Sequence, residues 1–307
     1  MPVSLAEARV FLESRFAVDP ANVAVAGNGQ WSHAYSYRRG TEHLIIRFGT
    51  HVEDFLKDQV AASFTSDALP VPAIHEIGEA LGGPYCVSTR AFGTLLDELD
   101  EAGVRAVLPA LLRGLDAARQ IDVSDTNGFG LWGDRTALHP TWRAFLLDVA
   151  VDDPLHRTHG WRERLAASPV GDCGFDAGIE RLASLVHACP EERHIVHSDL
   201  LNHNVLVAGS ELSAVFDWGC SLYGDFLYDI AWLAFWGPWY PSMRGIDIAA
   251  LARDHYRAIG VNVPRFEERL RCYELHIGLN GMSYKAFIGD WENYQWTARR
   301  IAAIPRD

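Results

Sequence analysis

The stretch of sequence that decides the fold is His197-Ser-Asp-Leu-Leu-Asn-His-Asn204, followed after a hydrophobic segment by Asp217-Trp-Gly219. The pattern is HxDxxxxN, then a strand-like run, then DxG. The residues that define this pattern include a carboxylate that could accept a proton and side-chain oxygens that could bind a hard cation. Short motifs occur by chance in many chains, but two of them at this distance form a specific signal.

The same order of residues occurs in protein kinases as HRDxxxxN and DFG. Phosphoryl transfer asks the protein mainly to position groups and to neutralise charge. We therefore expect Asp199 to orient an acceptor hydroxyl and take its proton, with His197 bracing the catalytic loop beside it. Asn204 and Asp217 supply hard oxygen atoms that suit Mg²⁺.

Two other interpretations of this region are weaker. Asp199 and Asp217 could be ordinary turn residues after strands, but their matched spacing argues against this. A metallohydrolase could instead use His194, His197 and His203. His194 and His197 are three apart in an expected strand, so they would point to opposite faces and could not bind one metal ion together.

The residues on either side of this motif predict two lobes of different class. Upstream, residues 1–16 and 53–66 are expected to be helical, and the second helix must end before Pro70 and Pro72. Strands are expected at 22–26, 33–38, 43–48, 73–78 and 85–89. Helices are expected at 95–121, 142–149, 176–188, 225–235, 248–259 and 266–288, with a β-like region at 194–217. This predicts an α+β protein with a small β-rich lobe over residues 1–90 and a mainly helical lobe over 91–307.

Composition excludes several classes of protein. The chain has 307 residues, of which 49% are hydrophobic and 22% charged, so it is globular. Its net charge of −13 would repel nucleic acid. No apolar run reaches the roughly 18–20 residues that span a bilayer, and residues 1–16 lack the basic-then-apolar order expected of a signal peptide. Five scattered cysteines favour neither disulfides nor a zinc ribbon. We expect a cytoplasmic monomer.

Several further segments resemble the aminoglycoside phosphotransferase family. They include Ala68-Leu-Pro-Val-Pro, Thr141-Trp-Arg, Cys189-Pro-Glu-Glu-Arg, Phe235-Trp-Gly-Pro-Trp and Arg271-Cys-Tyr-Glu-Leu. Within the family, they are most similar to the branch that phosphorylates hygromycin B. The resemblance implies a two-lobed kinase-like fold, ATP and Mg²⁺ as cofactors, and a polycationic aminoglycoside as acceptor. The alternatives are a kinase of this fold acting on a macrolide, fructosamine or amino-alcohol, or a nucleotide-binding pseudokinase.

The small lobe departs from the usual pattern of the family. Arg47 stands on the third strand where lysine is usual, and Asp58 stands on the following helix where glutamate is usual. An Arg47–Asp58 pair could bridge the same distance as a lysine–glutamate pair, because arginine is longer and aspartate is shorter. A guanidinium group also binds phosphate well. Lys57 is the second choice for the phosphate contact, because it is one of only two lysines, with Lys285, among 27 basic residues.

Two segments of the small lobe are expected to border the nucleotide. The loop from Gly29 to Ser32 would cover the phosphates through backbone amides, although a plain hairpin turn explains it equally well. Its GxG lies between strands and not before a helix, which argues against a dinucleotide fold. No GxxxxGK[ST] motif occurs, which excludes a P-loop kinase. The linker containing Ser88 and Arg90 would border the adenine.

Acidic and aromatic residues of the second lobe are candidates for the acceptor site. Carboxylates attract a polyamine, and aromatic rings stack on sugar faces. The candidate substrate residues are Asp225, Trp236, Trp239, Glu274 and Asp290. The competing interpretation is that most of these aromatic residues belong to the core. The resemblance to the family implies that Asp229 braces the catalytic loop.

Overall fold

The computed structural model describes residues 3–306. Contacts divide the chain into two units, Met1–Ala117 with Asn202–Ser221, and Ala118–Leu201 with Leu222–Asp307. This division differs from the single boundary expected at residue 90. One reason is that the short strand β6 (Thr94–Leu95) pairs with β10 (Val205–Ala208), which brings a later segment of the chain into the first unit.

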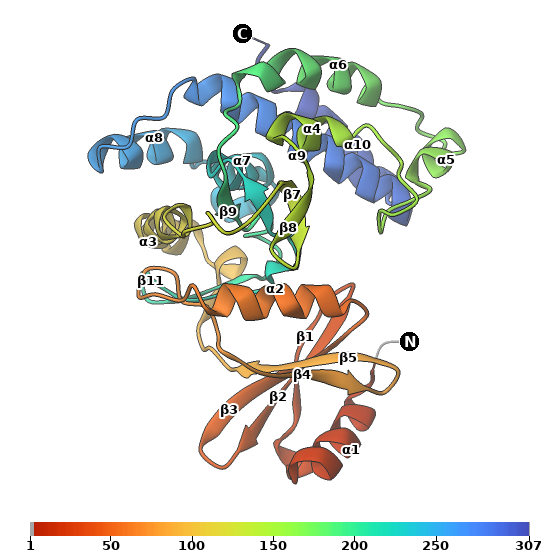
Figure 1. Ribbon diagram of the computed structural model, residues 1–307, viewed down its shortest axis with the longest axis vertical. Coiled ribbons are helices and arrows are strands. Elements are labelled where there is room, and N and C mark those ends of the chain that lie inside the picture. Colours follow the sequence, from red (N-terminus) through yellow and green to blue (C-terminus); the bar gives the residue numbers. More distant parts are fainter. Residues whose placement is uncertain (1–2, 307) are drawn as a thin grey trace. The chain divides into compact units, whose positions relative to one another are not determined.

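An antiparallel five-stranded sheet forms the base of the first unit, with the order β1-β2-β3-β5-β4 (Figure 1). Its strands are β1 (Ala24–Asn28), β2 (Ser32–Arg39), β3 (Glu42–Gly49), β4 (Ile74–Ala80) and β5 (Gly83–Thr89). Leu81 and Gly82 have φ values of 55° and 85° in the turn between β4 and β5. Positive φ at both central residues matches the right-handed twist of a tight hairpin.

Side chains along β3 point alternately to the two faces of the sheet, so each face carries different residues. Leu44, Ile46 and Phe48 are buried in a core with Leu12 of helix α1 (Leu5–Phe16). Arg47 has the opposite side-chain direction and contacts helix α2 (Val52–Ala62). Figure 1 shows α1 and α2 on opposite sides of this sheet. The period of two in a strand therefore separates the apolar face from the face that carries charge.

The rest of the first unit consists of a second small sheet and one long helix. The sheet has the order β11-β10-β6, and β11 spans Glu211–Val215. Helix α3 (Glu101–Arg119) begins later than predicted, because residues 94–98 form β6 and the 3₁₀ turn η2 (Leu96–Glu98). Helix α2 also ends earlier than predicted, at Ala62. Two further 3₁₀ turns are η1 (Pro20–Asn22) and η4 (Trp218–Cys220).

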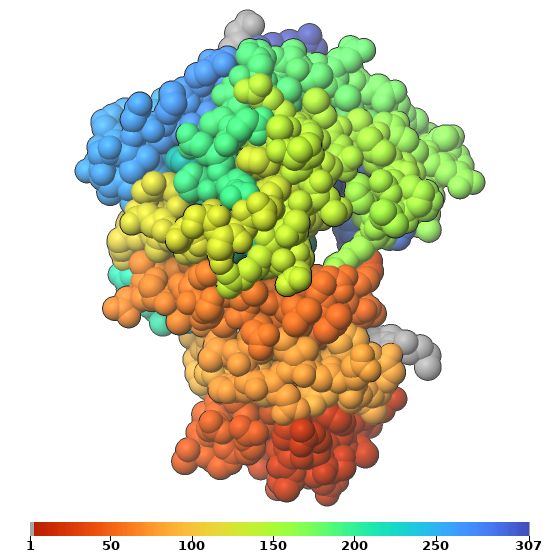
Figure 2. Space-filling model, in the orientation of Figure 1, coloured from red at the N-terminus to blue at the C-terminus, as the bar shows by residue number. Residues whose placement is uncertain are grey.

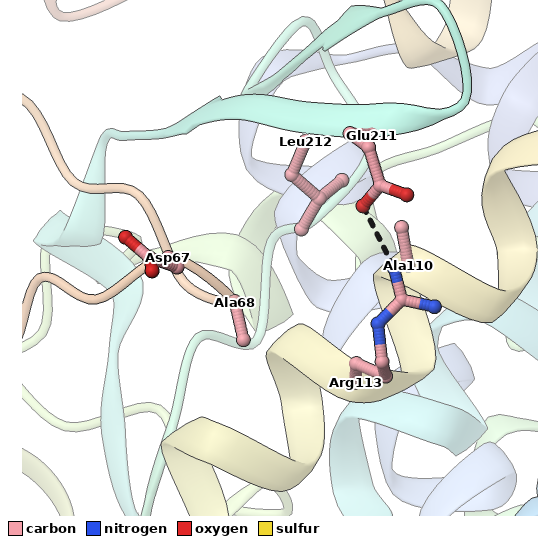
Figure 3. A pocket seen from close by; sticks show the side chains of 6 residues that line it. All are labelled: Asp67, Ala68, Ala110, Arg113, Glu211 and Leu212. Atoms are coloured by element: carbon pink, nitrogen blue, oxygen red, sulfur yellow. Dashed lines mark hydrogen bonds and ion pairs between the residues drawn. The ribbon is translucent and has the colours of Figure 1, made fainter.

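Helices dominate the second unit. They are α4 (Trp142–Asp148), α5 (Trp161–Ala166), α6 (Phe175–Leu185), α7 (Leu227–Trp236), α8 (Ile248–Ala258), α9 (Phe266–Ile288) and α10 (Trp291–Ala302). Helix α9 is central, since α5, α6, α7 and α10 all pack on it. Figure 2 shows the segment around α5 at the surface of this unit. Helix α10 was not predicted from the sequence.

A small sheet in the second unit leads directly into the predicted catalytic loop, which starts at His197. Its order is β8-β7-β12-β9, with β7 (Phe129–Gly133), β8 (Thr136–His139), β9 (His194–Val196) and β12 (Leu222–Gly224). Three 3₁₀ turns complete the unit, namely η3 (Val186–Ala188), η5 (Gly237–Trp239) and η6 (Pro241–Met243). The predicted α+β class, with one β-rich and one mainly helical part, is confirmed. Within residues 3–306, no helix combines the length and apolar character needed to cross a bilayer.

Candidate active site

Arg47 on β3 and Asp58 on α2 form the ion pair that the sequence predicts. Both side chains are largely buried, and the ring of Phe55 lies 5.1 Å from the guanidinium carbon. Burial acts to lower the pKa of Arg47, but the Asp58 and Asp217 carboxylates raise it above its usual value. The sheet therefore holds a permanent cation at a fixed place.

Asp217 lies beside this cation. One of its carboxylate oxygens is 3.8 Å from an Arg47 nitrogen, and 47% of the side chain is exposed. Asn204 precedes β10, and the Phe216 N–H donates to its carbonyl at 3.1 Å. Because β10 and β11 form an antiparallel hairpin, Asn204 and Asp217 lie at the same end of it.

The side chains of Asn204 and Asp217 suit Mg²⁺. Both offer oxygen ligands, which this ion prefers, and Mg²⁺ usually binds to one or two carboxylates together with phosphate oxygens and water. Among residues 3–306, no group of three histidine, cysteine or acidic side chains is arranged to hold a metal by itself. Desolvation raises the pKa of Asp217, and the Arg47 cation opposes this shift. The residues therefore fit a cation that is bound jointly with a nucleotide.

The segment from Gly29 to Ser32 forms a hairpin turn between β1 and β2. The Gly29 N–H donates to the Ser32 carbonyl at 2.8 Å, which closes the turn. Since that amide is engaged, a phosphate contact in this loop would use other groups. Trp31 anchors the loop, because its carbonyl accepts the Thr50 N–H and its ring meets the His51 ring.

Ser88 and Arg90 lie at the end of β5, where the linker was expected. Ser88 is buried in the sheet, and the Arg90 N–H donates to the His43 carbonyl at 3.0 Å. The Arg90 guanidinium carbon lies 4.9 Å from the Phe92 ring centre. A role for these residues beside adenine remains a prediction.

The second unit holds the catalytic loop by a buried carboxylate. Asp229 on α7 accepts the backbone N–H groups of His197 and Ser198 at 2.9 Å and 2.7 Å. His197 is buried, and its Nδ1 atom lies 3.2 Å from the Asp199 N–H, which donates to it. Ser198 has a φ of 57°, a left-handed conformation that needs such support. Asp199 itself is only half-buried, as a proton acceptor for a bound molecule must be.

Burial dominates the electrostatics of Asp229. It raises the pKa of this carboxyl to about 6, and the His197 and Ser198 N–H groups act in the opposite direction. The expectation that Asp229 braces the loop agrees with these contacts. His197 contacts Asp229 through its backbone N–H and Asp199 through its ring, and its bracing role remains a prediction.

The prediction that Asp225 contacts the substrate is contradicted. Its side chain is completely buried and binds Arg269 of α9 through both oxygens, at 2.6 Å and 2.9 Å. The Tyr273 hydroxyl and the Leu227 N–H also donate to it. Asp225 therefore ties the start of α7 to α9 and has no surface left for a ligand.

Glu274 and Asp290 are half-buried in the same unit. Burial raises the pKa of Glu274 to about 7, with Arg300 acting in the opposite direction. Asp290 caps α10, since its carboxylate accepts the Asn293 N–H at 3.3 Å and the Asn293 side-chain amide at 2.7 Å. A substrate contact by either acid remains a prediction.

Trp236 and Trp239 belong to an aromatic cluster that holds a lysine. Trp236 stacks on Trp296 with ring centres 6.1 Å apart, and Trp239 meets Trp296 edge-on at 4.6 Å. The Lys285 ammonium lies 5.2 Å from the Trp236 ring and 5.6 Å from the Trp239 ring. Trp296 and Lys285 were absent from the predicted site. The only sequence signal was the rarity of lysine.

Comparison with known sequences agrees with this arrangement. Residues 27–261 match the model of the phosphotransferase enzyme family. The chain is 32% identical over 281 residues to hygromycin-B 4-O-kinase of Escherichia coli, which covers 91% of this chain and 79% of the relative.

Solved structures place the fold in the same group. A crystal structure of a thermostable mutant of aminoglycoside phosphotransferase APH(4)-Ia, in ternary complex with AMP-PNP and hygromycin B, matches with a TM-score of 0.83 and 30% identity, covering 96% of this chain and 97% of that one. A spectinomycin phosphotransferase, APH(9)-Ia, matches with a TM-score of 0.64 at 11% identity over 100% of this chain and 97% of that one, which supports the fold alone. The family expected from the sequence is thus confirmed, and the chain belongs to the phosphotransferase enzyme family.

Proposed function

We propose that this chain transfers the terminal phosphoryl group of ATP to a hydroxyl group of hygromycin B, with Mg²⁺ as cofactor. The observation that carries this proposal is the 32% identity to hygromycin-B 4-O-kinase across 91% of the chain. The catalytic residues Asp199, Asn204 and Asp217 are all present in the spacing that the chemistry needs. A structure bound to both AMP-PNP and hygromycin B, at 30% identity, supports the same pair of substrates.

Asp199 is the residue that acts on the acceptor. Its carboxylate accepts the hydroxyl proton while the acceptor oxygen forms a bond to the terminal phosphorus and ADP leaves with the bridging oxygen. This role requires a fixed loop, and the Asp229 hydrogen bonds to His197 and Ser198 provide one. Base catalysis of this kind contributes roughly 10²–10⁴-fold in rate.

Charge on the phosphates is met by residues of the first unit. Arg47, held by Asp58, offers a guanidinium group whose planar donors match phosphate oxygens. Asn204 and Asp217 would hold Mg²⁺, which would supply positive charge against the phosphates. Because Asp58 fixes Arg47 from the buried side, little reorganisation is needed when the nucleotide binds.

The acceptor is a polyamine, and the net charge of −13 on the chain favours its binding by electrostatic attraction. Glu274, Asp290 and the half-buried faces of Trp236 and Trp239 are the groups proposed to meet it. Such binding should weaken as salt rises, because screening shortens the range of the attraction. A cytoplasmic location and a monomeric state remain predictions.

An acceptor panel tests the proposed substrate. Purified protein is incubated with ATP, Mg²⁺ and hygromycin B, kanamycin, gentamicin or spectinomycin, and the products are examined by mass spectrometry. We expect a phosphorylated product with hygromycin B and protection of a sensitive bacterium only on hygromycin B plates. A product with another compound alone would change the acceptor, and a product with none would reject the proposed activity.

A further inference from the structure

Helix α2 makes an unusual set of contacts with the loop that follows Asp217. Lys57 and Asp58 are adjacent on this helix, and both are at least nine-tenths buried. The Lys57 ammonium donates to the Gly219 carbonyl at 2.9 Å and to the Ser221 carbonyl at 3.2 Å. Asp58 accepts the Trp218 N–H at 2.7 Å. Three backbone groups of residues 218–221 are therefore bound by two neighbouring side chains.

Asp58 joins this loop to the phosphate-binding cation. One of its oxygens accepts from Trp218, and the other pairs with Arg47. The residue that fixes Arg47 thus also fixes the backbone directly after Asp217. A change in the position of α2 would move both groups together.

The contacts of Lys57 indicate a role in holding the loop after Asp217, and not the phosphate contact considered for it. A buried ammonium group is costly unless it is hydrogen-bonded. The Gly219 and Ser221 carbonyls are two acceptors of the Lys57 ammonium. These bonds offset that cost and tie two backbone carbonyls of the loop to helix α2. Gly219 packs against the same helix, since a Cβ atom there would lie 2.9 Å from Asp54.

The backbone of Asp217 explains why the loop needs such support. Asp217 has a φ of 62°, in the left-handed region that residues with a side chain seldom adopt. Residues in this region persist only where the surroundings over-determine them. The bonds from Lys57 and Asp58 begin at the next residue and supply that constraint.

We infer that Lys57 is a positioning residue for the Mg²⁺ ligand Asp217. Together with Asp58 it holds residues 217–221, here called the clasped loop, in the conformation that presents the Asp217 carboxylate. The inference rests on the proposed function for the role of Asp217. The mechanical part, a loop held by Lys57, holds for the protein without any ligand.

Lys57→Met tests this inference, because it keeps the length of the side chain and removes the donors. The first readout is hydrogen exchange of the Trp218 and Ser221 amides in protein free of metal and nucleotide. We expect exchange at these two amides to rise by about tenfold or more, as loss of charge-assisted bonds predicts. Exchange in β2 and β3 should stay at the wild-type rate, which separates local loosening from global unfolding.

The second readout is the Mg²⁺ concentration that half-saturates ADP binding, measured by calorimetry. It should rise by about tenfold in Lys57→Met, since a mobile ligand binds the ion less well, while ADP binding without Mg²⁺ stays unchanged. Arg105→Met, which removes an exposed pair with Glu101, is the control and should change neither readout.

A second variant allows the inference to be tested if Lys57→Met does not fold. Gly219→Ala places a methyl group against Asp54 and should shift the Mg²⁺ requirement in the same direction. Unchanged exchange and an unchanged Mg²⁺ requirement in either folded variant would overturn the inference. If wild-type protein bound no nucleotide, the proposed function would fail instead, and the exchange measurement would still decide whether Lys57 holds the loop.

Discussion

Asp229 accepts the backbone N–H of Ser198 at 2.7 Å, and Ser198 directly precedes the proposed base Asp199. The bond joins helix α7 to a residue in a left-handed conformation. Because the His197 N–H binds the same carboxylate, the direction of the catalytic loop is set by one buried acid. The position of Asp199 therefore depends on a residue that has no chemical part in the reaction.

Asp229→Ala should lower both stability and turnover. It leaves two buried N–H groups without an acceptor, and we expect the free energy of unfolding to fall by about 2–5 kcal/mol. The kcat should fall more than the KM for either substrate rises, because Asp199 loses its orientation. Urea unfolding and steady-state kinetics measure these effects, with the exposed Asp176→Ala as control. Wild-type kcat in a folded Asp229→Ala protein would argue against the brace.

Asp225→Asn distinguishes a structural carboxylate from a substrate contact. Breaking its buried pair with Arg269 should reduce the free energy of unfolding by about 3–5 kcal/mol. The KM for hygromycin B should stay close to that of the wild type at a temperature where the variant is folded. A raised KM with unchanged stability would restore the original prediction of a substrate contact.

Arg47→Met should weaken nucleotide binding both with and without Mg²⁺. Loss of hydrogen bonds from a charged donor costs about 1.5–3 kcal/mol, or roughly tenfold to a hundredfold in affinity. Lys57→Met should weaken only the nucleotide binding that depends on Mg²⁺. Calorimetry with ADP in the two metal conditions separates these cases, and the opposite assignment of effects would show that Lys57 is the phosphate ligand.

Glu274 gives a prediction about pH. Its folded pKa of about 7 lies above the value of roughly 4.3 in an unfolded chain, so the folded state binds more protons between these pH values. Its stabilising contribution is complete below pH 4 and is lost as pH rises through 7. Glu274→Gln should therefore become more stable relative to wild type between pH 5 and pH 8. Urea unfolding at both pH values checks this, and parallel curves would contradict it.

The sequence was informative where the decisive contacts are local or periodic. The catalytic motif follows from spacing within 21 residues, from His197 to Asp217. The Arg47–Asp58 pair was expected from the resemblance to the family, which places a cation on the third strand and a carboxylate on the following helix. The strands expected at 73–78 and 85–89 overlap β4 and β5, because strand-forming residues mark both segments.

Contacts between residues far apart in the chain could not be predicted from the sequence. Arg269 lies 44 residues from Asp225, so nothing near Asp225 showed that its charge was already neutralised. Lys57 was the second choice for the phosphate contact, but its ammonium donates to carbonyls more than 160 residues away. Helix α10 was missed although its sequence carries local signals, since Asp290 caps its start and the buried residues Tyr294, Thr297 and Ile301 recur at helical spacing.

The most direct test of the central claim compares wild type with Asp199→Asn in a single assay. Phosphate transfer from ATP to hygromycin B is followed by ³¹P NMR, and ADP affinity is measured in parallel. We expect a phosphorylated product with the wild type, a loss of roughly 10²–10⁴-fold in rate with Asp199→Asn, and nearly equal ADP affinity. Transfer by Asp199→Asn at the wild-type rate, or no transfer to hygromycin B by either protein, would contradict it.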